Sequence, residues 1–131
     1  MINFAIIDKN IKYREYMLQK CRNILNEYEY TLKEYASVES CVQDTEYANQ
    51  CNIFIIDEEF ISSKNFKRLK KLYLVNKNMN IMFYGSQNER MLKAYEMDPF
   101  YFVLKQEMEE KLKMALCRGI QRYENKKARI F

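Results

Sequence analysis

The 131-residue chain is 48% hydrophobic and 31% charged, which fits one compact domain with a single core and excludes a chain that is disordered throughout. Its formal net charge of +4 is mild, and acidic residues lie among the basic ones along the sequence, so charge alone does not indicate a nucleic-acid-binding protein. Histidine is absent, which removes the commonest metal ligand and the usual general base of hydrolases.

The cysteines and the N-terminal residues limit the location of the protein. No CxxC pair occurs, and we expect reduced, mostly buried thiols rather than a disulfide pair or a metal cluster at Cys21, Cys41, Cys51 and Cys117. The N-terminal apolar run stops at Asp8, which is too early for a signal peptide, and no segment approaches the roughly 20 apolar residues of a membrane span. We expect a cytoplasmic protein with no membrane partner.

The first predicted elements are two strands and two helices. The short apolar run at 3–7 lacks the alternation of a half-solvated strand, which predicts a central parallel strand buried on both faces. Residues 11–28 place apolar side chains close to a 3.6-residue period and predict an amphipathic helix. A weaker strand pattern follows at 28–36, and residues 37–50 predict a helix with Ser37 as its N-cap.

The middle of the chain repeats this order of strand and helix. Apolar runs at 52–56 and 80–84 predict two more buried strands. Helical patterns follow them at 62–78 and 88–98.

The last predicted strand, at 100–104, precedes a helix at 106–127 in which Gly119 weakens the pattern near the end. The last ten residues, "RYENKKARIF", are basic and end with hydrophobic residues. We expect a domain at 1–122, with 123–131 as a basic C-terminal tail or the start of a linker to an output domain that this chain lacks.

Strand and helix alternate five times, which predicts an α/β fold with a doubly wound, five-stranded parallel sheet and helices on both faces, of the flavodoxin-like type. Ligands of such folds gather outside the carboxyl ends of the strands. Four polar residues fall there, and we expect them to line a site: Asp8, Asp57, Ser86 and Lys105.

These residue types suit phosphoryl chemistry. Carboxylate oxygens hold a hard Mg²⁺ ion, a further carboxylate can attack phosphorus, and an ammonium group stabilises phosphoryl oxygens. The glycine-rich loops of nucleotide-binding folds are absent, which argues against a P-loop or dinucleotide site.

Across essentially its whole length the sequence resembles the receiver domains of bacterial response regulators. The resemblance rests on Asp8 after "FAII", Asp57 after "NIFII", Gly85 and Ser86 after "IMFY", and Lys105 after "FVL", which stand in the order and approximate spacing of the family. The stretch "IMFYGSQNERMLKAYEMDPFYFVLKQ" is most similar to the LytTR branch of these receivers.

The resemblance implies a role for each of these residues. Asp57 would accept a phosphoryl group from a histidine kinase. Mg²⁺ would be held by Asp8, by Asp57 and by the backbone carbonyl or side chain of Glu59. Lys105 and Ser86 would stabilise the phosphoryl group.

Departures from the family pattern predict an atypical site. Lys9 stands where the family has a second acid, so we expect weak Mg²⁺ binding. Lys9 would be a substitute cation near Asp57 or simply a solvated charge, and Glu58 or Glu59 would compensate for the missing acid.

Further departures concern the switch and the loops. The resemblance places Phe102 at the aromatic switch position, with core packing as the alternative, and Gly85 replaces the hydroxyl residue that draws this aromatic inward. Ile61 and Gln106 stand where prolines are common, and we expect a trans bond between Lys105 and Gln106.

The resulting functional hypothesis is a two-component receiver that is not an enzyme in its own right. Phosphorylation would control homodimerisation through the face of the fourth predicted helix, the fifth strand and the fifth helix, and DNA would be contacted only through a separate output domain. One alternative is a phosphorylation-independent pseudo-receiver that acts as a protein-interaction module. Another is a small flavin-binding or phosphatase-like enzyme.

Overall fold

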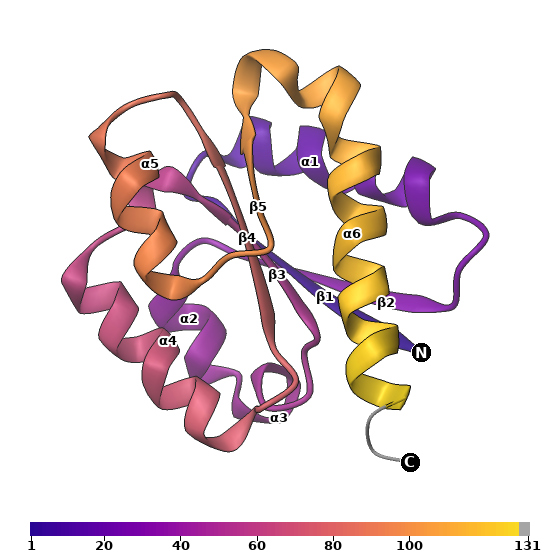
Figure 1. Ribbon diagram of the computed structural model, residues 1–131, viewed down its shortest axis with the longest axis horizontal. Helices are drawn as coiled ribbons and strands as arrows, with labels where there is room; N and C mark the ends of the chain where they lie inside the picture. Colours follow the sequence, from indigo (N-terminus) through magenta and orange to yellow (C-terminus); the bar gives the residue numbers. More distant parts are fainter. Residues whose placement is uncertain (129–131) are drawn as a thin grey trace.

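The computed structural model describes residues 1–128 and contains a single five-stranded sheet (Figure 1). The strands are β1 (Ile2–Ile7), β2 (Tyr30–Tyr35), β3 (Ile53–Asp57), β4 (Asn80–Gly85) and β5 (Tyr101–Leu104). Their order across the sheet is β2-β1-β3-β4-β5, and every neighbouring pair is parallel. The predicted doubly wound parallel sheet is therefore confirmed, with β2 and β5 at its edges.

Helices cover both faces of the sheet (Figure 1). One face packs against α1 (Ile11–Leu25) and α6 (Met108–Ala128). The other face carries α2 (Val38–Gln43), α3 (Thr45–Ala48), α4 (Ser63–Val75) and α5 (Glu89–Ala94). Short 3₁₀ turns stand at η1 (Glu58–Phe60), η2 (Tyr95–Met97) and η3 (Lys105–Glu107).

The central strands are apolar throughout because neighbouring residues of one strand face different helical layers. In β1, Phe4 and Ile6 pack toward α1 and α6, whereas Ala5 and Ile7 pack toward the opposite layer. All four side chains are fully buried. Each buried Phe or Ile contributes about 1.5–3 kcal/mol, so the two cores on either side of the sheet dominate the stability of the fold.

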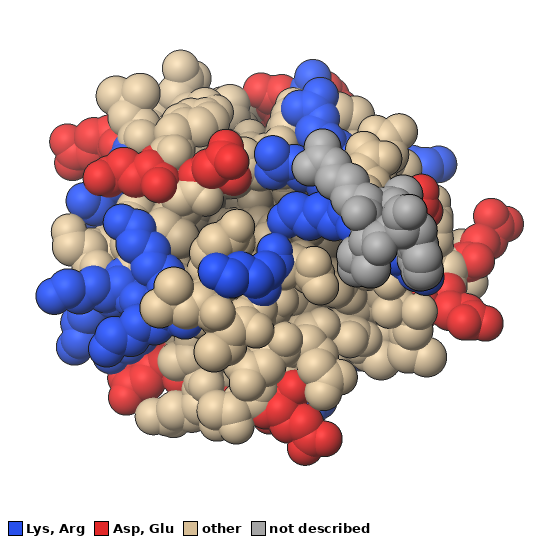
Figure 2. All heavy atoms as spheres, turned by 60° about the horizontal axis from the view of Figure 1, so that its bottom comes forward, with Lys and Arg blue, Asp and Glu red and all other residues tan. Residues whose placement is uncertain are grey.

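The fold separates charge more than the linear sequence suggests. The exposed side of α4 carries Lys64, Lys67, Lys70 and Lys71, and the helix contains no acidic residue. Figure 2 shows Lys and Arg side chains gathered on the side of the molecule where α4 lies.

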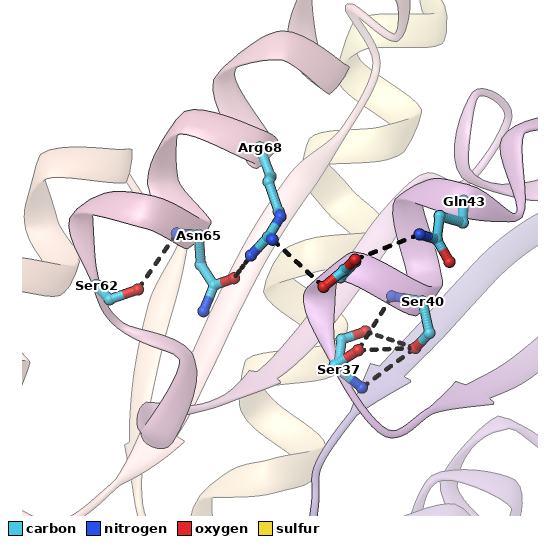
Figure 3. A network of polar contacts seen from close by, with 7 residues as sticks. Ser37, Ser40, Gln43, Ser62, Asn65 and Arg68 are labelled. Carbon is cyan, nitrogen blue, oxygen red and sulfur yellow. Dashed lines mark hydrogen bonds and ion pairs between the residues drawn. The ribbon is translucent and has the colours of Figure 1, made fainter.

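Side-chain caps fix where α2 and α4 begin (Figure 3). Ser37 Oγ accepts a hydrogen bond from the N–H of Ser40 at 3.0 Å, and Ser40 Oγ accepts one from the N–H of Ser37 at 3.2 Å. This capping box confirms the predicted N-cap, and Ser62 caps α4 in a similar way. Arg68 of α4 pairs with Glu39 of α2 at 3.3 Å, which ties the two neighbouring helices together.

Two predicted helices differ from the structure. The segment 37–50 is not one helix, because Asp44 leaves helical geometry at φ −82°, ψ 68° and its carboxylate accepts a hydrogen bond from the Tyr35 hydroxyl at 2.7 Å. The helix predicted at 88–98 ends as α-helix at Ala94 and continues as a 3₁₀ turn. Asp98 then adopts a left-handed conformation, with φ 49°, directly before Pro99.

The C-terminal helix reaches further than the predicted domain boundary. α6 continues to Ala128 and includes the first residues of the predicted tail, while 129–131 lie outside the described residues. The division into 1–122 and 123–131 stays a prediction.

Residues 1–128 can be checked for disulfides, for cis peptide bonds and for helices able to span a membrane. All four cysteines are unpaired, and three of them are buried. No peptide bond in this range is cis, which includes the bond after Lys105. No helix within it is long and apolar enough to span a bilayer.

Candidate functional site

Three of the predicted site residues meet at the carboxyl edge of the sheet. Asp8 directly follows β1, Asp57 ends the neighbouring strand β3, and Lys105 directly follows β5. Lys105 Nζ lies 3.4 Å from Asp57 Oδ1. Both acids are almost completely buried, at 1% and 5% exposed. The parallel sheet thus gathers the two acids and the lysine predicted from strand ends.

Asp57 has one oxygen that is not hydrogen bonded. Its Oδ2 accepts the N–H of Glu59 at 3.3 Å, whereas Oδ1 is buried and accepts no hydrogen bond from the described residues, having only the ion-pair contact with Lys105. Burial raises the pKa of Asp57, the negative charge of Asp8 raises it further, and Lys105 and the Glu59 N–H partly oppose this. Oδ1 is therefore a buried acceptor available to an electrophile or a cation.

Each carboxylate oxygen of Asp8 accepts a hydrogen bond. Its Oδ1 accepts the N–H of Asn10 at 2.8 Å, and its Oδ2 accepts the hydroxyl of Tyr84 at 2.5 Å. Tyr84 is fully buried in β4, and burial followed by the bond to Asp8 raises the pKa of its phenol. Tyr84 was not predicted as a site residue from the sequence, although its position next to Gly85 at the end of a predicted strand would have placed it at the same edge.

Two tyrosine rings surround the ammonium group of Lys105. Its Nζ lies 4.5 Å from the ring centroid of Tyr13 and 5.8 Å from that of Tyr84. The two rings stack with centroids 5.6 Å apart and planes at 27°. Burial chiefly raises the pKa of Tyr13, to about 12, so its phenol stays neutral at physiological pH. The rings hold the lysine beside Asp57 through cation–π contacts.

Lys9 and Glu59 lie at the surface rather than against Asp57. Their side chains are 73% and 50% exposed and form an ion pair with each other at 3.8 Å. An exposed pair of this kind contributes little to stability. Of the predicted roles for these side chains, the structure favours a solvated charge for Lys9.

Glu58 makes a contact that the sequence analysis did not predict. Its Oε2 accepts the N–H of Ser86 at 2.8 Å and lies 3.5 Å from the side-chain nitrogen of Asn88. A Cβ placed on Gly85 would lie 2.2 Å from the same oxygen. The Glu58 carboxylate therefore lies directly on Gly85, in space that any other residue at that position would fill.

Phe102 is a core residue in this structure. It is 6% exposed, lies opposite Phe83 in the register of β5 and β4, and packs with the layer of α2 to α5. It also forms part of a surface hollow of about 380 Å³ that includes Met91 and Tyr95. Its role as a switch stays a prediction.

The arrangement fits Mg²⁺ poorly. Both oxygens of Asp8 accept hydrogen bonds, and the side chain of Glu59 is directed toward Lys9. Within residues 1–128, no three acidic, cysteine or histidine side chains are grouped so as to hold a metal ion. Asp57 Oδ1 is the one oxygen of these three carboxylates that is buried without a hydrogen bond in the described part of the chain.

Comparison with known proteins shows a likeness of structure only. No model of a protein family matches the sequence, and no curated protein matches it. The signal receiver domain of an HD domain-containing protein from Pseudomonas fluorescens Pf-5 aligns with a TM-score of 0.74 at 14% identity, over 98% of this chain and 93% of that chain.

Two further structures are similar. A response regulator receiver domain protein from Clostridium thermocellum aligns with a TM-score of 0.69 at 16% identity, over 98% of each chain. A putative pilus assembly-related protein from Burkholderia pseudomallei K96243 aligns with a TM-score of 0.72 at 15% identity, over 93% of this chain and 91% of that chain. The chain therefore has the fold of response regulator receiver domains.

Proposed function

We propose that this chain is a cytoplasmic receiver domain of a two-component system, in which Asp57 accepts a phosphoryl group from a histidine kinase. The observation that carries the proposal is the buried Oδ1 of Asp57, which has no hydrogen bond in the described residues and lies 3.4 Å from an ammonium group. Such an oxygen is a nucleophile with a cation beside it, as phosphoryl transfer requires.

In the proposed reaction, Asp57 Oδ1 forms a bond to phosphorus while the bond from phosphorus to a histidine nitrogen of the kinase breaks. The departing imidazole keeps the electron pair of that bond and is protonated by solvent. Lys105 stabilises the added charge on the phosphoryl oxygens, held in place by Tyr13 and Tyr84. In this proposal the chain receives a group that the kinase supplies, and the expectation that it is not an enzyme stays a prediction.

The readout we propose is a change at the surface of α5, β5 and α6. Leu92 and Tyr95 are exposed there, at 77% and 54%, beside the hollow that includes Phe102. Apolar side chains at a sheet edge suit a homodimer or a partner domain. Contact with DNA would require an output domain outside this chain, and membership of the LytTR branch stays a proposal.

The test is labelling with an acyl phosphate, followed by intact mass, with and without Mg²⁺. We expect one phosphoryl group on the unmodified chain and none on Asp57→Asn. Lys105→Ala should label more slowly, whereas Lys9→Ala, which removes an exposed cation close in sequence to Asp8, should label normally. Labelling that persists in Asp57→Asn would contradict the assignment of the acceptor.

One observation favours a second candidate function, a pseudo-receiver that works without phosphorylation. The Glu58 carboxylate already occupies the N–H of Ser86, so a negative charge is present at this edge before any transfer. In this case the unlabelled chain would bind its partner as tightly as the labelled one. Equal partner affinity of the labelled and the unlabelled chain would support the second candidate.

A further inference from the structure

The backbone N–H of Ser86 is the centre of an anion contact at the end of β4. It donates to Glu58 Oε2 at 2.8 Å, and the side-chain amide of Asn88 approaches the same oxygen at 3.5 Å. A hydrogen bond from an N–H to an ionised carboxylate is among the stronger hydrogen bonds in proteins. Glu58 thus occupies a position that attracts an oxygen carrying negative charge.

This position lies at the end of the strand that neighbours the strand of Asp57. Asp57 pairs with Tyr84 in the register of β3 and β4, Glu58 directly follows Asp57, and Gly85 and Ser86 directly follow Tyr84. The bond from Ser86 to Glu58 therefore joins the two strand ends between which a group attached to Asp57 would lie.

We infer that the tethered carboxylate of Glu58 takes the place of a phosphoryl oxygen and must move aside before Asp57 can be modified. This inference rests on the proposed function. The negative charge of Glu58 opposes the approach of an anionic phosphodonor. Its hydrogen bond also occupies the Ser86 N–H, which is then not available to a phosphoryl oxygen. Displacement of Glu58 by a phosphoryl oxygen would transfer that N–H from one anion to another.

Gly85 provides an independent way to displace Glu58. An alanine Cβ at this position would lie 2.2 Å from Oε2, 2.4 Å from Cδ and 2.5 Å from Cγ of Glu58. All three atoms belong to a flexible, partly exposed side chain, and Gly85 does not have a positive φ. Gly85→Ala should therefore push the carboxylate off Ser86 and leave the backbone intact.

The experiment measures the initial rate of Asp57 labelling at a low concentration of acyl phosphate. We expect Glu58→Ala and Gly85→Ala each to raise the rate roughly tenfold, the size expected when one charge-assisted hydrogen bond is released. The double variant should gain no more than either single variant, because both remove the same contact. Glu46→Ala is the matched control and should label at the rate of the unmodified chain, since Glu46 is an exposed glutamate on α3, outside the candidate site.

A second readout reports the contact itself. The backbone amide of Ser86 should exchange its hydrogen faster in Glu58→Ala and in Gly85→Ala than in the unmodified chain, as followed by NMR. Equal labelling rates in the unmodified chain, Glu58→Ala and Glu46→Ala would overturn the inference while the proposed function stands.

Failure of the proposed function has a different signature. If no variant is labelled although Asp57 is intact, the phosphoacceptor assignment fails, and inorganic phosphate then decides the inference. A phosphate-dependent shift of the Ser86 amide signal in Glu58→Ala but not in the unmodified chain would support it. The same response in both proteins would overturn it.

Discussion

Asp8 and Asp57 are both buried acids of the same site, but their hydrogen bonding differs. Asp8 accepts two hydrogen bonds, from Asn10 and Tyr84, whereas Asp57 leaves Oδ1 to the ammonium group of Lys105. Burial and the charge of Asp8 raise the pKa of Asp57, which means that the folded protein favours its neutral form more than the unfolded chain does. The site therefore holds a reactive acid at a cost to stability.

Asp57→Asn is expected to stabilise the protein at neutral pH. The folded-state pKa of Asp57 lies above the unfolded value of about 3.9, so both states are protonated below that value and the variant gains nothing there. As pH rises through the folded-state pKa, the unmodified protein bears the cost of ionising a buried acid. Urea unfolding at about pH 3 and pH 7 measures this difference.

Asp44 offers a control of opposite sign. The hydrogen bond from Tyr35 lowers the pKa of Asp44, and Lys33 lowers it further. Asp44→Asn should therefore lose stability at neutral pH and lose little at acid pH. Variants of Asp57 and Asp44 that respond to pH in the same direction would contradict this account.

Tyr84→Phe is expected to destabilise the protein and to strengthen Mg²⁺ binding. It leaves Asp8 Oδ2 buried without its hydroxyl donor, at a cost of about 1–3 kcal/mol. The same change frees that oxygen as a ligand, so added Mg²⁺ should restore stability to the variant more than to the unmodified chain. Thermal unfolding with and without Mg²⁺ measures both effects.

The control for this change is Tyr30→Phe. The hydroxyl of Tyr30 makes no hydrogen bond with a side chain or backbone group of the described chain, so its removal should alter neither stability nor the response to Mg²⁺. If Mg²⁺ stabilised the unmodified chain and Tyr84→Phe equally, the hydroxyl of Tyr84 would not be what limits metal binding.

Among the elements, α6 shows how a tertiary contact overrides helix propensity. Gly119 interrupts an otherwise helical pattern, and an alanine in an exposed helix would gain about 1 kcal/mol over glycine. A Cβ at this position would, however, lie 2.7 to 2.9 Å from ring atoms of Phe100, which is 6% exposed. The glycine therefore allows α6 to approach the start of β5.

Gly119→Ala should destabilise the protein despite the better propensity of alanine. Crowding a buried ring costs about 1–3 kcal/mol, which exceeds the gain from propensity. We expect a net loss of about 1 kcal/mol in the free energy of unfolding by urea. Gln121→Ala, at an exposed position of the same helix, should be close to neutral. A Gly119→Ala variant more stable than the unmodified chain would show that Phe100 moves freely.

At the scale of the whole molecule, exposed apolar side chains are not confined to the proposed dimer face. Leu92 lies on α5 beside β5, and Leu74 lies at the end of the lysine-rich helix α4. They are 77% and 68% exposed, so they are matched in size and exposure. The proposed dimer face includes only the first of them.

Leu92→Glu is expected to weaken dimerisation of the phosphorylated chain at least about tenfold, because it replaces a leucine worth about 1.5–3 kcal/mol of burial with a charge. Leu74→Glu should leave the dimer unchanged. Sedimentation of each variant over a range of concentrations measures the dissociation constants. A monomeric phosphorylated chain, or equal weakening by both changes, would refute the proposed face.

The sequence was sufficient to predict the sheet and the gathering of Asp8, Asp57 and Lys105, because buried strands have apolar runs and parallel strands end at one edge. Other features depend on contacts that have no local pattern. The bond from Ser86 to Glu58 joins residues 28 apart and depends on a glycine whose role is visible only when both strand ends are placed. The break in the helix at Asp44 was not predicted, because it is accompanied by a hydrogen bond from the Tyr35 hydroxyl of β2 to the Asp44 carboxylate, which no local pattern indicates.

The stack of Tyr13 on Tyr84 has a consequence for spectroscopy. The chain contains no tryptophan, so tyrosine dominates its near-ultraviolet absorption. Two rings held 5.6 Å apart in a rigid, asymmetric setting couple their transitions, and the ammonium group of Lys105 lies over one of them at 4.5 Å. Any event at Asp57 that moves this lysine will alter the near-ultraviolet circular dichroism, which makes the site an optical reporter of its own state without an attached label.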